Sequence, residues 1–206
     1  MKIHDISMII EPEIQVYKNK KEKKPEFINT SNHDKGNAYE TRLCLDLHTG
    51  THIDAPLHMI EGGETTEIYQ LEEFVTDCKV IDLTDIENHI GRSHLENHEI
   101  SEGDFLLFKT SNSFIEDFDF NFIYLAEDGT DYLLEKRVKG VGIDALGIER
   151  SQPEHPTHKK LLSRGIMIIE GLRLKDINSG RYQLIIAPLK IRNVEAAPAR
   201  ALLIKE

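Results

Sequence analysis

The segment from Leu47 to His58, LHTGTHIDAPLH, restricts the local fold more than any other part of this 206-residue chain. It contains a glycine, three β-branched residues and a proline, and each of these disfavours an α-helix. The sequence therefore predicts an extended segment with a bend near Gly50. Side chains two residues apart point to the same side of an extended chain. Four potential ligands share this phase and can converge on one point: His48, His52, Asp54 and His58.

Three imidazoles and one carboxylate form a donor set that zinc- or manganese-type ions bind. A metal ion held in this way can activate water. The other interpretation is a polar strand edge whose histidines are incidental. Because buried polar groups need partners, four donors in one phase favour the metal site.

The composition indicates a globular protein without a large basic surface. Hydrophobic residues make up 39% of the chain, charged residues 30%, and the formal net charge is −11. Phosphates repel an acidic chain, so no nucleic-acid partner is expected. We find neither an apolar run long enough to span a bilayer nor the apolar stretch of a secretory signal, and therefore expect a cytoplasmic protein without a membrane partner. The length predicts a single domain over residues 1–206.

Short apolar runs alternate with short helical patterns along the chain. Strands are expected at residues 3 to 10, 39–47, 78–83, 104–109, 140–143, 165–169, 182–187 and 200–204. Helices are expected at residues 66–75 with Thr66 as N-cap, at 130–139 ended by Gly140, and at 158–163 ended by Gly165. This interleaving predicts an α/β protein with a mixed β-sheet. The two cysteines are too few for a disulfide scaffold, and Cys44 is expected to be a small buried strand residue.

Two segments each have two interpretations. The basic stretch from Lys18 to Lys24 is either a solvated loop or a lid near an acidic or aromatic substrate. The stretch from Phe114 to Tyr124 alternates acidic and aromatic residues. It is either a surface loop whose aromatic rings pack inward, or an aromatic wall of a pocket or subunit interface.

The other ligands of a metal site must come from distant parts of the chain. Glu170 ends the apolar strand at 165–169, where a carboxylate is costly to bury unless it is paired or metal-bound. Ligand sites in α/β sheets also lie beyond the carboxyl ends of strands. Four candidates follow the strand at 140–143: Glu149, Glu154, His155 and His158. A helix start holds His158 rigidly, but the sequence alone chooses only weakly between His155 and His158.

The segment HTGTHIDAPLH resembles the H-x-G-T-H-x-D-x-P-x-H motif of the cyclase family of metal-dependent hydrolases, which includes bacterial kynurenine formamidases and isatin hydrolase. Further similar segments follow in the family's order at residues 140–144, 158–162, 169–172, 187–189 and 197–201, so the resemblance covers nearly the whole chain. It implies a swivelling β/β/α domain with short helices, assembled as a homodimer or homotetramer.

The resemblance also implies a set of metal ligands. His48, His52 and Asp54 would bind a first ion, and Asp54 would bridge to a second ion completed by His158 and Glu170. Two divalent ions per chain are implied, zinc in the first place and manganese as the alternative.

The implied activity is hydrolysis of a carbon–nitrogen bond in a small amide. The implied substrate is N-formylkynurenine, a compound of tryptophan catabolism, or a related N-formyl arylamine. His58 matches the proton donor and acceptor of the family, and Tyr17 lies at the approximate place of an aromatic residue that stacks on the aryl ring. The loop around Tyr17 departs from the family, because it is rich in lysine instead of proline and glycine.

Two alternative functions remain open. One is hydrolysis of a cyclic amide or ester such as isatin or a lactone, and the other is a metal-stabilised binding protein without turnover.

Overall fold

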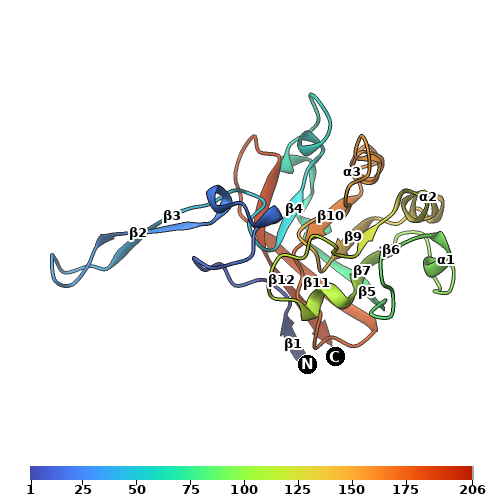
Figure 1. The fold of residues 1–206 in the computed structure, drawn as a ribbon, viewed down its shortest axis with the longest axis horizontal. Helices are drawn as coiled ribbons and strands as arrows, with labels where there is room; N and C mark the ends of the chain where they lie inside the picture. Colours follow the sequence, from blue (N-terminus) through green and yellow to red (C-terminus); the bar gives the residue numbers. More distant parts are fainter. Residues whose placement is uncertain (206) are drawn as a thin grey trace.

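The computed structural model describes residues 1–205 and has a central β-sheet that closes into a ring (Figure 1). The strands of the ring are β4 (His52–Asp54), β5 (Val75–Asp82), β7 (Phe105–Lys109), β9 (Gly140–Ile143), β10 (Met167–Glu170), β11 (Gly180–Pro188) and β12 (Ala196–Lys205). They pair in the order β12, β11, β5, β7, β9, β10 and β4, and β4 pairs again with the start of β12. The strand β1 (Lys2–Asp5) pairs with the other end of β12.

Strand directions in the ring are mixed. The strands β5, β7, β9 and β10 run parallel, whereas the remaining neighbours are antiparallel. The predicted α/β class with a mixed sheet is therefore confirmed, and the expected strands from residue 78 onward correspond to β5, β7, β9, β10, β11 and β12.

Side-chain alternation along β7 separates two hydrophobic cores. Phe105 and Leu107 belong to a cluster with residues from β4, β5, β10, β11 and β12, which is the interior of the ring. Leu106 and Phe108 belong to a second cluster, which lies between the ring and its helices. Gly140 makes room for the inner cluster, because a Cβ atom there would lie 2.1 Å from the ring of Phe105.

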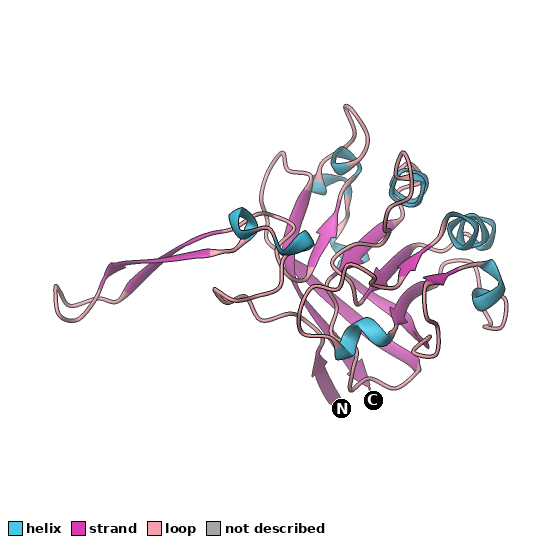
Figure 2. Cartoon of the chain, viewed as in Figure 1, coloured by secondary structure: helices cyan, strands magenta, loops and turns pink. Residues whose placement is uncertain are grey.

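The helices cover the outside of the sheet (Figure 2). They are α1 (Arg92–Leu95), α2 (Glu127–Lys136) and α3 (Pro156–Leu162), and a small parallel sheet of β6 (His89–Ile90) and β8 (Tyr124–Leu125) lies beside them. The described part of the chain also has six short 3-10 helices in its connections: η1 (Tyr17–Asn19), η2 (Lys21–Lys23), η3 (Pro56–His58), η4 (Thr66–Ile68), η5 (Leu71–Phe74) and η6 (Ser111–Phe114). Within residues 1–205 no helix has the length and apolar character needed to cross a membrane.

A two-stranded arm projects from the body of the protein (Figure 1). It consists of β2 (Glu26–Ser31) and β3 (Glu40–Cys44), which pair with each other and with no strand of the ring. The expected strand at 39–47 is therefore part of this arm. Cys44 is exposed there, so the prediction that it is buried was wrong.

Two predicted helices were also placed wrongly. Residues 66–74 form η4 and η5 with an extended link between them, and Val75 already belongs to β5. The Tyr69 hydroxyl donates a hydrogen bond to the backbone oxygen of Asp54 (2.7 Å) and holds this link against β4. The helix expected at 130–139 is α2, which ends before Arg137, and the left-handed conformation of that residue (φ 55°) closes it. Gly140 instead begins β9.

Candidate metal centre

The bend predicted near Gly50 is present, and it contacts a second turn. Gly50 has a φ of 67° and Gly171 a φ of 69°, a region that glycine enters without steric cost. A Cβ atom on Gly171 would lie 2.4 Å from the backbone oxygen of Gly50. The Thr51 hydroxyl donates to the Gly171 carbonyl (2.6 Å). The histidine-rich segment is thus fixed against the residue that follows β10.

The pairing of β4 with β10 places three donors on one face of the sheet. Ile53 points into the ring, so His52 and Asp54 point outward. Glu170 lies opposite His52 in the antiparallel register and shares its face. The Nε2 atom of His52 is 3.4 Å from a Glu170 oxygen and 3.5 Å from an Asp54 oxygen.

The first turn of α3 adds His158 to this face. Its Nε2 atom lies 3.3 Å from Oε1 of Glu170 and 3.7 Å from Oδ2 of Asp54. The helix begins at Pro156 and not at His158, in keeping with the preference of proline for the first helical turn. His155 turns away, since its side chain is 53% exposed and its Nδ1 atom contacts Glu149 (2.5 Å).

Glu149 supports His158 from behind. Its carboxylate is buried, accepts a hydrogen bond from the backbone N–H of Thr157 (2.8 Å) and lies 3.2 Å from Nδ1 of His158. Carboxylates in this position orient metal-binding imidazoles. The sequence marked Glu149 only as one of several candidates, because nothing in the spacing shows that this loop turns back onto α3.

His48 and His58 complete the cluster from the segments before and after β4. The Nδ1 atom of His48 lies 3.1 Å from Asp54 Oδ1, and the rings of His48 and His58 are 4.2 Å apart between centroids. The ring of His58 is also 5.5 Å from that of His158. The five side chains expected to be ligands and the one expected to carry the proton therefore lie together: His48, His52, Asp54, His158 and Glu170, with His58.

The donor atoms of the cluster suit a divalent cation. The Nδ1–H of His52 donates to the Gly50 carbonyl (2.9 Å), which fixes the ring with its Nε2 atom facing the carboxylates of Asp54 and Glu170. That Nε2 atom and both carboxylate oxygens of Asp54 are buried without a hydrogen-bond partner. Leaving such atoms unpaired costs about 1–3 kcal/mol each. Imidazole nitrogens and carboxylate oxygens are ligands that zinc and manganese accept, so the residues fit such an ion.

The carboxylates in the cluster are ionised at neutral pH. Burial raises the pKa of Asp54, but its close contacts with the imidazoles of His48 and His52 hold that pKa well below its usual value. Burial and the charge of Asp54 raise the pKa of Glu170, and contacts with His158 and His52 outweigh both and lower it to about 2. Burial lowers the pKa of His52 and of His158, yet the neighbouring carboxylates raise each to about 10. Positive charge is therefore favoured between these carboxylates.

His58 differs from its neighbours. Burial lowers the pKa of its imidazole, so the ring is neutral at pH 7. Among the described residues, no carboxylate or carbonyl orients its ring nitrogens in the way that Gly50 orients His52. A neutral histidine without such a partner is free to accept and return a proton.

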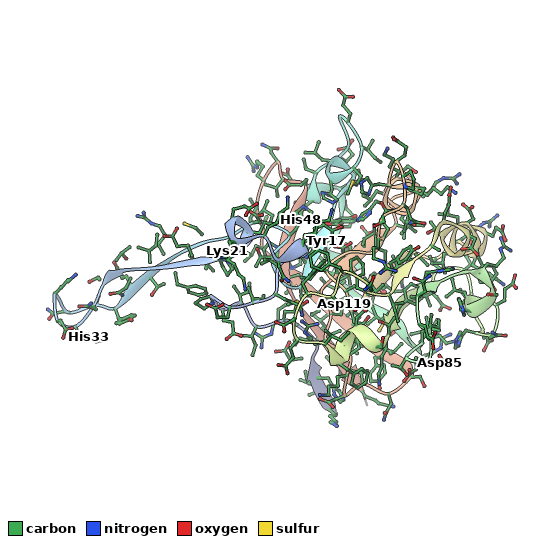
Figure 3. All side chains as sticks on the ribbon, viewed as in Figure 1. Tyr17, Lys21, His33, His48, Asp85 and Asp119 are labelled. Atoms are coloured by element: carbon green, nitrogen blue, oxygen red, sulfur yellow. The ribbon has the colours of Figure 1, made fainter. Side chains whose placement is uncertain are left out.

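A cavity of about 320 Å³ opens beside the cluster. His58, His158 and Glu170 line one part of it, and Tyr17 and Lys18 line another. Figure 3 shows Tyr17 and His48 near the centre of the molecule. The cavity is large enough for a small substrate to reach the donor cluster.

Buried aromatic rings support Tyr17. Its ring packs edge-to-face on Phe118 (5.4 Å between centroids) and Phe122 (6.5 Å). Both phenylalanines are buried, whereas Phe114 and Phe120 are exposed. The segment from Phe114 to Tyr124 thus packs partly inward. Its two buried rings contact Tyr17, and Tyr17 in turn lines the cavity.

Comparison with known proteins gives the family. The family model described as "Putative cyclase" matches residues 4–150. The chain belongs to this family. The cyclase-family chain is 32% identical over 206 residues to a kynurenine formamidase of Salinibacter ruber, with 98% of this chain and 97% of that protein covered.

Solved structures share the fold. A "predicted metal-dependent hydrolase" from Bacillus stearothermophilus superposes with a TM-score of 0.90 at 52% identity, over 98% of this cyclase-family chain and 97% of that one. Isatin hydrolase A from Labrenzia aggregata has a TM-score of 0.85 at 23% identity, over 100% and 94% of the two chains. At that identity the isatin enzyme supports the fold alone. The family resemblance expected from the sequence is confirmed.

Proposed function

We propose that this protein is a divalent-metal-dependent hydrolase that cleaves the amide carbon–nitrogen bond of a small N-formyl arylamine. One observation carries the proposal: Asp54 belongs to two donor groups at once. It is grouped with His48 and His58 on one side and with His52 and Glu170 on the other, with the donor atoms of each group within 4.8 Å of one another. A carboxylate shared in this way suits two ions per chain.

The ligands would be the five residues His48, His52, Asp54, His158 and Glu170. Their nitrogen and oxygen donors, without thiolate, suit zinc and, as the alternative, manganese. When bound, such ions lower the pKa of water and polarise a carbonyl oxygen.

His58 carries the proton in this proposal. It accepts a proton from the attacking water and donates it to the leaving nitrogen, so that the amine departs neutral and formate is the second product. Proton transfer of this kind contributes about 10²–10⁴-fold to the rate. The half-buried position of His58 beside the cavity lets it reach both atoms.

The formamidase relative and Tyr17 support the substrate class. The Salinibacter ruber protein, similar over nearly its whole length, is a kynurenine formamidase. The ring of Tyr17, held by Phe118 and Phe122, offers an aromatic surface at the cavity for an aryl group. A cavity of about 320 Å³ suits a substrate with one aromatic ring.

We expect the purified protein to carry two divalent ions per chain and to hydrolyse N-formylkynurenine and formanilide. A chelator should remove the ions and the activity together, and zinc or manganese should restore both. Elemental analysis and release of formate measure the two quantities. Isatin and a simple lactone test the cyclic alternatives, and hydrolysis of these alone would contradict the formamidase assignment. Full activity in metal-free protein would contradict the metal-dependent mechanism.

The arm supports assembly into a homodimer or homotetramer. A two-stranded hairpin alone is at best marginally stable in water. Phe27 and Leu43 lie opposite each other on one face of the arm, with 41% and 42% of their surfaces exposed. We propose that this face packs on another copy of the chain, because burial of the facing pair would stabilise the arm.

Replacing both Phe27 and Leu43 by aspartate should therefore shift the protein to a smaller species. Light scattering coupled to size-exclusion chromatography measures the mass. Asn37→Asp, in the turn of the arm, adds a negative charge without removing apolar surface and should leave the mass unchanged. A wild-type protein that is monomeric at micromolar concentration would rule out the assembly.

A further inference from the structure

Five lysines lie between residues 18 and 24 of a chain whose net charge is −11, and they do not have the same contacts. Lys23 forms an ion pair with Asp46 (3.1 Å). The ammonium group of Lys24 donates to the backbone oxygens of Glu13 (2.9 Å) and Ile14 (2.8 Å). These two side chains attach the segment to the body of the protein. A loop that is merely solvated would not need such contacts.

Lys18 has a different place. It lines the cavity beside the donor cluster, and its ammonium group lies 5.2 Å from the centroid of the Tyr17 ring. Within residues 1–205, no carboxylate lies within 4.0 Å of this ammonium group. Lys18, Lys20 and Lys21 are all exposed, but of these three only Lys18 lines the cavity. Lys23 also lines the cavity but is paired with Asp46. Of the five lysines, Lys18 is thus the one that lines the cavity without a carboxylate partner.

The backbone at Lys18 is strained. Lys18 and the next residue, Asn19, have φ values of 59° and 50°. Asparagine adopts this left-handed conformation comparatively readily, but for lysine it is unfavourable. Such conformations persist where the surrounding structure enforces them, and they occur at ligand-binding sites. Here Tyr17 is packed on Phe118 on one side, and Lys23 is paired with Asp46 on the other. These two contacts hold the backbone between them, and the Lys18 side chain lines the cavity in this conformation.

The anionic groups of the cavity already have partners. Asp46 is paired with Lys23, and Glu149 contacts both His155 and His158. Glu170 contacts His158 and accepts a hydrogen bond from the backbone N–H of Ile148 (2.5 Å). Among the described residues that line the cavity, no carboxylate is left for Lys18, and a concave surface concentrates the field of its charge on whatever enters. An acidic group on a ligand in the cavity would give Lys18 a charge partner.

We propose that Lys18 binds a carboxylate of the substrate, so that the enzyme prefers N-formyl arylamines that carry an acidic group over neutral ones. This inference rests on the proposed formamidase function and narrows its substrate class. The aryl group would contact Tyr17, the formamide would face His58, and the carboxylate would pair with Lys18. Lys18 would then contribute to substrate selection and would take no part in the hydrolysis itself.

The test compares three probes: formanilide, which is neutral, and 2-formamidobenzoate and N-formylkynurenine, which carry carboxylates. Lys18→Met keeps the length of the side chain and removes its charge. We expect it to raise KM about fivefold for at least one of the two acids, the scale of an exposed ion pair, with kcat unchanged. The KM for formanilide should not change. Lys18→Arg should restore the preference, and Lys20→Met, on the same loop, should behave as wild type.

Two results would overturn the inference. One is an unchanged KM for both acids in Lys18→Met, and the other is an equal loss on formanilide and the acids, which a purely structural role would give. The failure of the formamidase proposal has a different signature, because wild-type protein would then hydrolyse none of the three probes. In that case calorimetric binding of 2-formamidobenzoate still decides: weaker binding by Lys18→Met than by wild type supports the carboxylate site, and equal binding refutes it.

Discussion

Replacing Asp54 by asparagine is expected to remove most of the bound metal and to lower kcat by about 10³-fold or more, since a metal ion supplies several kcal/mol of transition-state stabilisation. Both oxygens of Asp54 are buried and unpaired, and they lie between His48, His52 and His158. The amide has the same shape but no charge, and one of its two donor atoms is an NH₂ group that cannot bind a cation.

Metal content per chain and the rate of formate release measure this effect. Asp85→Asn is a matched control, because Asp85 is exposed and lies far from His48 (Figure 3). Circular dichroism establishes that the Asp54→Asn protein is folded. A folded Asp54→Asn protein with full metal content and full activity would remove Asp54 from the centre.

The second large effect is expected at His58. His58→Gln should keep the metal content of the wild type and lose about 10²–10⁴-fold in kcat, because glutamine cannot accept and return a proton. A loss of metal together with activity would instead make His58 a ligand, which its place beside His48 and Asp54 also permits. His33→Gln, at the tip of the arm in Figure 3, controls for histidine replacement as such.

The pH profile gives an independent measurement of His58. Its folded-state pKa lies below the ordinary value of 6.5 because of burial, and the neutral ring is the form that accepts a proton. Activity should therefore be complete at pH 7 and fall as the pH drops through a value below 6.5. This acidic limb should be absent from the residual activity of His58→Gln. A limb above pH 7 would contradict the assignment.

The sequence predicted the local part of the donor cluster, because short-range physics determines which of these side chains share a face. Gly50, the β-branched residues and Pro56 exclude a helix, and the alternation of an extended chain then brings His52 and Asp54 to one face. Glu170 was found from a similar local argument, as a carboxylate ending an apolar strand. The strands from residue 78 onward carry enough apolar residues to be recognised in the same way.

The parts that the sequence did not predict depend on contacts between distant segments. Closure of the ring needs the pairing of β12 with β4, which no local pattern reveals. Residues 66–75 have a helical pattern, yet the hydrogen bond from Tyr69 to Asp54 overrides it. The strand that contains Cys44 was recognised, but its place in an exposed arm was not. The contact of Glu149 with His158 likewise depends on the conformation of the loop before α3, and no pattern in the sequence of that loop predicts it.

The contact between the turns at Gly50 and Gly171 has a consequence for how the protein handles its ions. The spacing of His52 and Glu170 is set by backbone pairing, by the Thr51 hydroxyl and by two turns in van der Waals contact, none of which involves a cation. Exchange of one divalent ion for another then requires no refolding. Among the ions that this nitrogen and oxygen donor set accepts, intrinsic affinity and the supply of each ion around the protein would then decide which one is bound.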